Sequence, residues 1–155
     1  MEAHVPFTHI MVPTDGSETS IHAGRLAINM AALHQARITL VYVLDSTIAD
    51  EIAGVTKNRL EHIKQELETK GKHYLDYLAR LAKTNGVETE QVIRHGTPYS
   101  EIASLAKRLD VNLIVIGRVG CRGARCALVG SVAERVIEYA HCRVLVVSQP
   151  PATPL

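Results

Sequence analysis

The sequence contains no tryptophan and only one phenylalanine among its 155 residues, and aromatic residues make up 4%. Proteins that bind single-stranded nucleic acid stack bases on aromatic side chains, so this scarcity argues against that class. Neither sign of charge dominates, since 17 basic residues stand against 16 acidic ones and the net charge is +1. Binding to a nucleic-acid duplex needs a basic face, so we expect no nucleic-acid partner.

Long apolar runs and a cysteine framework are also missing. No run approaches the roughly 20 apolar residues of a membrane-spanning helix, so no membrane insertion is expected. The first residues, MEAHVPFTH, lack the basic and apolar regions of a signal peptide. The cysteines are odd in number, which predicts free thiols in a reducing compartment: Cys121, Cys126 and Cys142. These absences together predict a cytoplasmic protein.

What the sequence does contain is a regular alternation of strand and helix patterns. Hydrophobic residues make up 46%, enough for the packed core of one domain over 1–155, with flexible tails at 1–7 and 149–155. Short β-branched runs alternate with segments whose apolar residues recur every three or four positions. This order predicts a parallel sheet with helices on both faces. The expected strands are 9–14, 36–45, 88–94, 112–116 and 143–147, and the expected helices are 18–34, 58–84, 98–109 and 131–140.

Two loops of this arrangement are candidates for a binding site. In an open parallel sheet, ligands bind beyond the carboxyl ends of the strands, where the strand order reverses. With the first strand central, the loops after the first and fourth strands meet at that point. These loops, PTDGSETS (13–20) and GRVGCRGARCALVGS (117–131), are also the richest in glycine, serine and threonine.

The second loop has features of a phosphate site. Gly130 and Ser131 stand at the start of the expected fourth helix, where free N–H groups and the helix dipole attract anions. An alternative remains open from the residues alone, because Ser131 and Glu134 have the spacing of a capping box, which needs no ligand. Arginine grips phosphate through two parallel hydrogen bonds, and three arginines lie in the loop: Arg118, Arg122 and Arg125.

Asp15, at the end of the first strand, also allows two interpretations. Its carboxylate is suited to hold a ribose hydroxyl or a metal ion beside phosphates. Equally, Asp15 and Gly16 have the sequence of a turn in which the aspartate bonds to its own backbone.

In the second loop, Cys121 and Cys126 lack a second ligand pair, so free thiols are preferred over a metal site.

The spacing of the second loop resembles a known signature. Gly117 is followed after two residues by Gly120, and after nine more by Gly130-Ser131. This G-x2-G-x9-G-[ST] pattern resembles the ATP-binding signature of the universal stress proteins. IMVPTDGSETS, LVYVLD and HGTPYSEI are similar to further segments of that family, and the likeness extends over about residues 8–148.

The resemblance implies an α/β fold of the adenine-nucleotide α-hydrolase-like type, with a five-stranded parallel open sheet of order 3-2-1-4-5. It implies bound ATP, or ADP or AMP, with Mg²⁺ or Mn²⁺ held through the phosphates and no direct protein ligand. Pro13 and Asp15 would lie beside the adenosine, the backbone of Val43 would face the adenine edge, and Gly117 would lie near the ribose. Phosphates would be held by Gly120, Gly130, Ser131 and Val132. The full candidate set is Pro13, Thr14, Asp15, Val43, Ile116, Gly117, Gly120, Arg122, Gly130, Ser131 and Val132.

The resemblance also implies a function and partners. The protein would be a nucleotide-binding regulator or adaptor of the stress response rather than an enzyme, since no general base beyond Asp15 is evident. It would form a homodimer through its last strand, Arg143 to Val147, and act on a further protein such as a transporter or kinase. Two alternatives stay open, namely a nucleotide-free dimeric adaptor and a slow ATPase. Arg118 and Val119 depart from the residues common in the family.

Overall fold

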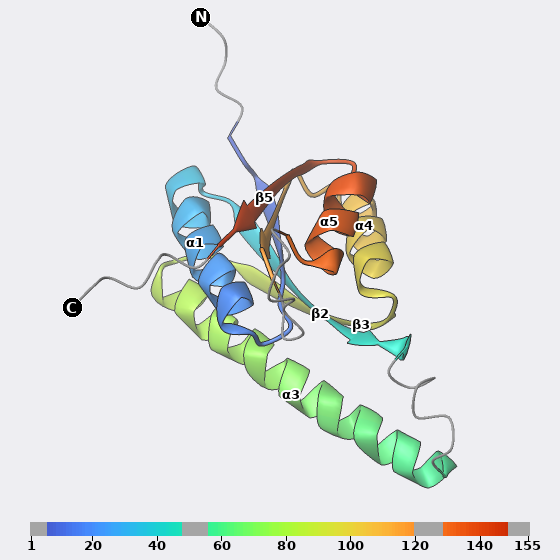
Figure 1. Ribbon diagram of the computed structural model, residues 1–155. Helices are drawn as coiled ribbons and strands as arrows, with labels where there is room; N and C mark the ends of the chain where they lie inside the picture. Colours follow the sequence, from blue (N-terminus) through green and yellow to red (C-terminus); the bar gives the residue numbers. More distant parts are fainter. Residues whose placement is uncertain (1–5, 48–55, 120–128, 149–155) are drawn as a thin grey trace, which may run out of the picture.

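The computed structural model describes residues 6–47, 56–119 and 129–148, and these residues form an α/β fold (Figure 1). Strands and helices alternate along the chain as the sequence pattern predicts. The strands are β1 (His9–Pro13), β2 (Arg37–Asp45), β3 (Thr89–Gly96), β4 (Leu113–Gly117) and β5 (Arg143–Val147). The helices are α1 (Glu18–His34), α3 (Lys57–Thr84), α4 (Pro98–Arg108) and α5 (Ser131–Tyr139).

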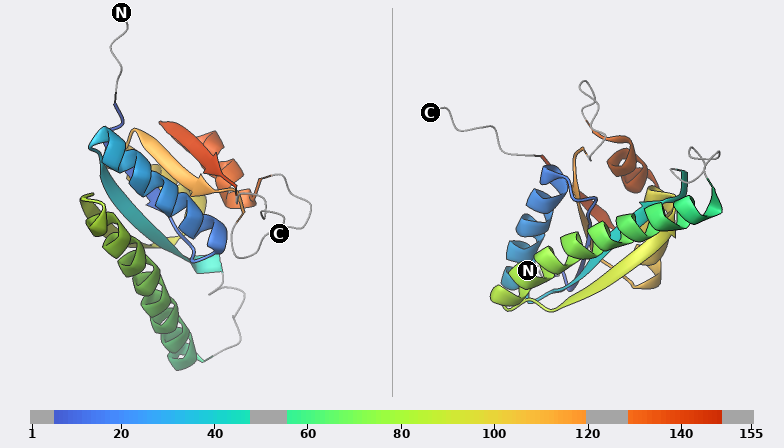
Figure 2. Two further views of the ribbon diagram at one scale, coloured as in Figure 1. Left: turned by 90° about the vertical axis from the view of Figure 1, so that its left-hand side faces the viewer. Right: turned by 90° about the horizontal axis from the view of Figure 1, so that it is seen from below.

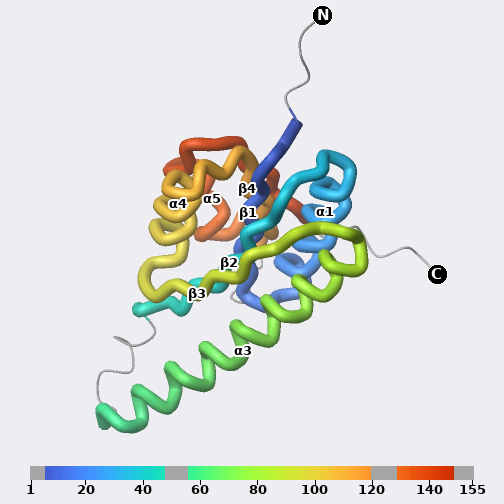
Figure 3. Tube along the Cα trace, turned by 180° about the vertical axis from the view of Figure 1, so that it is seen from behind, coloured from blue at the N-terminus to red at the C-terminus, as the bar shows by residue number. Residues whose placement is uncertain are grey.

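The five strands form one sheet in the order β3-β2-β1-β4-β5, and every pairing is parallel. The predicted strand order is therefore confirmed. β1 lies at the centre, paired with β2 on one side and β4 on the other, as the view from behind shows (Figure 3). All residues of β1 and β4 are buried, which explains why both strands read as continuous apolar runs.

Helices cover both faces of the sheet (Figures 1 and 2). α1 and α3 pack on one face, where Ala27 and Leu78 belong to a core shared with Ile10 of β1. α4 and α5 pack on the other face, where Leu105 and Val136 belong to a second core. The sheet is thus closed to water above and below, and its carboxyl end remains as the place for a site.

The longest helix, α3, extends beyond the sheet at its amino-terminal end (Figures 1 and 2). Its buried residues all lie in its second half, from Gly71 to Ala82. Gly71 is one of them because the ring of Tyr42 lies where a Cβ would be. The helix ends at Asn85 and Gly86, as predicted, and Gly86 has a φ of +70°.

Small differences from the expected elements lie at their ends. β3 continues to Gly96, two residues beyond the expected strand. Ser17 caps α1, since its side chain accepts a hydrogen bond from the Ser20 N–H at 3.2 Å. Thr97 stands at the N-cap of α4, but its side chain makes no capping hydrogen bond.

Candidate functional site

The two candidate loops begin side by side at the carboxyl end of the sheet. β1 and β4 are neighbours, and the loops after Pro13 and Gly117 leave from their ends. Gly117 touches the first turn of α1, since a Cβ added there would lie 3.0 Å from the Ser20 nitrogen. The predicted meeting of the two loops is confirmed.

The turn after β1 is held by its own hydroxyl groups. Thr14 is buried, and its Oγ1 lies 2.9 Å from Ser20 Oγ and accepts a hydrogen bond from the Gly16 N–H at 3.2 Å. The Thr14 N–H donates to the carbonyl of Val41 at 2.8 Å. Thr14 therefore shapes the turn from inside, and its hydroxyl is engaged by the protein itself.

Asp15 adopts the turn that the sequence left open. Its Oδ1 accepts a hydrogen bond from the Ser17 N–H at 3.0 Å, while the residue as a whole is exposed at the rim of the site. Gly16, next in the chain, has a φ of +82°, and the ring of Tyr74 occupies the space of a Cβ. Glycine is required there on both grounds. The carboxylate of Asp15 is thus fixed in place just beyond the end of β1.

Two further candidates line the same end of the sheet. Pro13 is the last residue of β1 and is paired with Val41 of β2. Val43 lies two residues farther along β2, beyond the last register pair of β1, and is half-buried. A segment of β2 backbone around Val43 therefore runs past the end of β1.

The end of β4 forms a narrow neck with the start of α5. Ile116 is buried, and the N–H of Arg118 donates to the carbonyl of Val147 at 2.8 Å, continuing the β4–β5 ladder. The carbonyl of Arg118 accepts from the N–H of Gly130 at 2.6 Å. We refer to this Gly130–Arg118 hydrogen bond as the neck bond. It joins the two residues that flank the 119–129 connection.

The neck explains why glycine stands at two signature positions. Gly130 has a φ of −68°, which any residue adopts, so conformational freedom is not the reason. A Cβ at Gly130 would lie 3.0 Å from the Arg118 carbonyl oxygen and 3.3 Å from Val119 Cα. Close approach of two backbone segments is therefore the structural requirement at Gly130, as it is at Gly117.

The capping-box alternative for α5 is wrong. The N-cap is Gly130, so Ser131 is the first helical residue, and no side chain caps the helix. The Glu134 N–H bonds to the Gly130 carbonyl at 3.0 Å, whereas residues 131–133 find no hydrogen-bond acceptor for their N–H groups among the described residues. Ser131 and Val132 are exposed. This first turn has the unsatisfied N–H groups and the dipole that attract anions.

The remaining candidates of the second loop lie outside the described residues. Gly120 and Arg122 fall in the segment 120–128, as do Arg125, Cys121 and Cys126. Cys142 is half-buried and free, and burial raises the pKa of its thiol.

Sequence reasoning missed the residues that support the turn from behind. Ser20 is buried on an otherwise apolar helix face and bonds to Thr14, and its own Oγ donates to the Ser17 carbonyl at 2.9 Å. Val147 takes part through its backbone carbonyl, which carries no sequence signal. A serine at a core-facing helix position was the one available clue.

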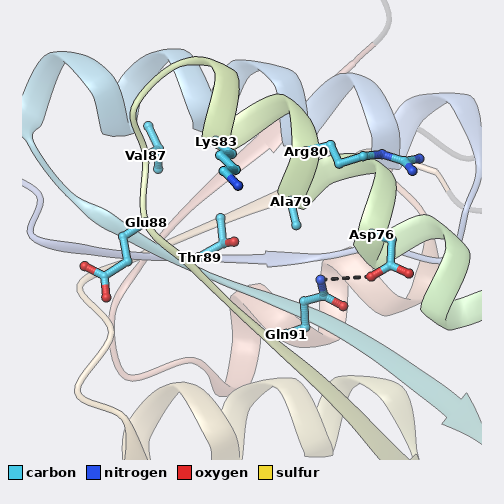
Figure 4. Close-up of a pocket in the computed structure, with 8 residues that line it drawn as sticks. All are labelled: Asp76, Ala79, Arg80, Lys83, Val87, Glu88, Thr89 and Gln91. Carbon is cyan, nitrogen blue, oxygen red and sulfur yellow. Dashed lines mark hydrogen bonds between the residues drawn. The ribbon is translucent and has the colours of Figure 1, made fainter.

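A separate groove lies between α3 and the edge strand β3 (Figure 4). Gln91 donates to Asp76 there at 3.1 Å, and this bond, together with one from Lys72, lowers the pKa of Asp76. Basic and acidic side chains line the groove in comparable number, and Arg80 and Glu88 are among them. It lies away from the ends of β1 and β4, so the two predicted loops take no part in it.

Within the described ranges, no cluster of histidine, cysteine or acidic side chains is arranged to hold a metal ion. Over the same ranges, no helix has both the length and the apolar character needed to cross a membrane.

Comparison with known proteins identifies the family of this chain. Residues 6–148 match the sequence model of the Universal stress protein family. The chain belongs to the universal stress protein family. Among curated members, Universal stress protein MJ0531 of Methanocaldococcus jannaschii is 36% identical over 144 residues, covering 93% of this chain and 84% of that protein. Universal stress protein YxiE of Bacillus subtilis is 30% identical over 146 residues, covering 91% and 99%.

Solved structures of universal stress proteins share the fold. Hypothetical protein MJ0577 superposes with a TM-score of 0.84 at 26% identity, covering 96% of this chain and 100% of that one. UspA from Lactobacillus plantarum gives 0.79 at 28% identity, covering 93% and 99%. A universal stress protein from Archaeoglobus fulgidus in complex with dAMP gives 0.66 at 24% identity, covering 92% and 99%, which bears on the fold alone.

Proposed function

We propose that this universal stress protein binds an adenine nucleotide, ATP foremost, in the crevice at the carboxyl ends of β1 and β4. The observation that supports this proposal is the first turn of α5, which begins beside the end of β4 and whose N–H groups at 131–133 have no acceptor among the described residues. Phosphate oxygens are suited to such a turn. Members of the fold have been solved with cAMP, dAMP and AMP, which supports an adenine nucleotide as the ligand class.

The residues present fit such a ligand at both of its ends. The backbone of Val43 runs past the end of β1, where it is available to the edge of a base. Ser131 is exposed at the first position of α5 and offers a hydroxyl beside the free N–H groups. Asp15, fixed by its turn, borders the same crevice. We assign base, sugar and phosphates to these three regions in that order, with a divalent ion held through the phosphates.

The proposed role is regulatory. The bound nucleotide would change the surfaces that meet a second copy or another protein, and hydrolysis, where it occurs, would be slow. The described part of the crevice offers Asp15 as its carboxylate at the rim, and Asp15 is already bonded to Ser17. A group held in a turn is poorly suited to accept a proton from an attacking water.

Replacement of Gly130 by leucine tests the proposal. A side chain at Gly130 meets Arg118 and Val119 at 3.0–3.3 Å and must displace the start of α5. We expect ATP binding, measured by isothermal titration calorimetry, to weaken more than tenfold. Thr97→Leu is the matched control. Thr97 also stands at a helix N-cap without a capping side-chain hydrogen bond, but it begins α4, which follows the edge strand β3.

The outcomes separate the candidate functions. Tight binding by the wild type and by Thr97→Leu, with loss in Gly130→Leu, supports the nucleotide site. No heat of binding from the wild type at millimolar ATP would favour the nucleotide-free adaptor instead. Phosphate release above the buffer rate, absent in Gly130→Leu, would favour the slow ATPase.

A further inference from the structure

The neck bond uses the Gly130 N–H, which the glycine signature is expected to offer to a phosphate oxygen. Gly130 is the third signature glycine, and its N–H already donates to the Arg118 carbonyl at 2.6 Å. An N–H group has one hydrogen, which points at one acceptor when the bond is short and well aligned. The same N–H therefore cannot serve a phosphate oxygen while the neck bond persists.

We infer that the neck bond is a latch, which must open before the Gly130 N–H can bind a nucleotide phosphate. This inference rests on the proposed nucleotide site and adds a regulatory step to it. The closed form is the one seen here, with the Gly130 N–H on the Arg118 carbonyl. In the open form the phosphate replaces that carbonyl as the acceptor.

The β4 side of the neck is held too firmly to be the moving part. The N–H of Arg118 is bonded to Val147 of β5, and the preceding Gly117 lies so close to α1 that an added Cβ would be 3.0 Å from the backbone of that helix. Gly117 is itself paired in the sheet, opposite Val147. Movement of this segment would break a ladder bond or push into α1.

The α5 side of the neck has more freedom. Gly130 lacks a side chain, so the peptide that joins it to Val129 can rotate over a wide range of φ. The first turn of α5 is exposed at Ser131 and Val132, and the helix is anchored farther along, at Ala133 and Val136. Opening is therefore a local rotation at Gly130, with α5 and the sheet remaining in place.

The latch also lies at the end of the β4–β5 ladder. In a parallel ladder the N–H and the carbonyl of one residue point to the same neighbouring strand. The N–H of Arg118 is bonded to β5, so its carbonyl stands where the next rung would form, and Gly130 takes that place. Opening the latch exposes this carbonyl beside the last strand, which connects the phosphate site with the β5 edge.

Nuclear magnetic resonance measures the latch directly in the intact protein. A scalar coupling across the hydrogen bond, between Gly130 ¹⁵N and Arg118 ¹³C′, reports whether the bond is present. We expect this coupling without ligand, its loss at saturating ATP, and its persistence with adenosine, which has no phosphate. The Ala140 N–H to Val136 carbonyl bond, 2.8 Å long at the other end of α5, is the internal reference and should be unchanged throughout.

Each result decides a different part of the inference. ATP binding with the coupling retained would overturn the latch while leaving the nucleotide site standing. Loss of the coupling with adenosine as well as with ATP would overturn the inference that a phosphate competes with the Arg118 carbonyl for the Gly130 N–H. Absence of the coupling in the free protein would show that the bond is not closed, and absence of any ATP binding would overturn both proposals together.

Discussion

At the scale of single residues, the glycines near the site stand where a side chain would not fit. A glycine can be required by a positive φ, by the close approach of a ligand or by another segment of the chain. Gly16 does have a positive φ, but Gly117 and Gly130 are required by contacts between segments of the chain itself. A spacing pattern reports that a side chain is excluded at a position, but it cannot tell whether ligand or protein excludes it.

A buried histidine at the opposite end of β1 makes stability depend on pH. His9 is 5% exposed, and its Nε2 lies 2.7 Å from Thr39 Oγ1. Burial, followed by the charge of Arg37, lowers the pKa of His9 below its ordinary value of 6.5, while the Leu109 carbonyl, Glu90 and Asp110 act in the opposite direction. The unfolded chain therefore binds a proton more readily than the folded one.

The sign of the effect follows from this difference. Above pH 6.5 His9 is neutral in both the folded and the unfolded chain, so it does not lower the free energy of unfolding. Below pH 6.5 protons bind preferentially to the unfolded chain, and the free energy of unfolding falls until the pH passes the lowered pKa of His9 in the folded chain. We expect His9→Gln to reduce this loss between pH 7 and pH 5, measured by urea unfolding. The exposed His73, changed to Gln, is the control, and equal acid sensitivity of all three proteins would contradict the prediction.

At the scale of elements, strands and helices were predictable because each carries its own periodicity. β1 and β4 read as continuous apolar runs, and α4 repeats its buried residues at three and four positions. The start of α5 at Ser131 was predicted correctly, but the capping box that Ser131 and Glu134 suggest is absent, because Gly130 stands at the N-cap and no side chain caps the helix. Contacts between distant segments, such as the neck bond, form at that cap, and a local pattern does not contain them.

Gly71 shows the same conflict between local propensity and packing inside α3. Alanine is favoured over glycine in a helix interior by about 1 kcal/mol. At Gly71, however, a Cβ would overlap the ring of Tyr42 on β2, and overpacking of a core costs about 1–3 kcal/mol. We expect Gly71→Ala to lower the free energy of unfolding by about 1–2 kcal/mol, measured by chemical denaturation.

Two controls separate the causes. Lys70→Ala, one residue earlier and exposed, should change stability by no more than about 0.5 kcal/mol. Combining Gly71→Ala with Tyr42→Leu should cost less than the sum of the single changes, because the smaller side chain leaves space for the new methyl group. Stabilisation by Gly71→Ala alone would show that propensity outweighs packing at this position.

At the scale of the whole molecule, the described sheet ends on two edge strands, β3 and β5, and the two differ in their surroundings. β3 lies beside the charged groove against α3, whereas β5 has half-buried apolar side chains and lies near α5, where Ile137 is 50% exposed. Unpaired apolar edges favour association with another strand. We therefore propose, as the sequence suggested, a symmetric dimer through β5.

The alternation of the ladder shows which β5 residues to change. The carbonyl of Val147 accepts from Arg118 on β4, so Val147, Leu145 and Arg143 direct their backbone groups toward β4. Val144 and Val146 direct their backbone N–H and carbonyl groups away from β4. Val144→Pro therefore removes one outward N–H and leaves the bonds to β4 intact, and proline is tolerated on such an edge.

Sedimentation velocity of this variant tests the dimer through its backbone alone. We expect Val144→Pro to weaken self-association at least about tenfold, since a lost N–H leaves a partner carbonyl without its hydrogen bond. Val144→Ala keeps the N–H while shortening the side chain, and it should remain closer to the wild type. Equal weakening by both variants would mean that side-chain packing, rather than strand pairing, holds the copies together; a monomeric wild type would refute the dimer. Because the neck bond ends the same ladder, added ATP should shift the dimer equilibrium of the wild type.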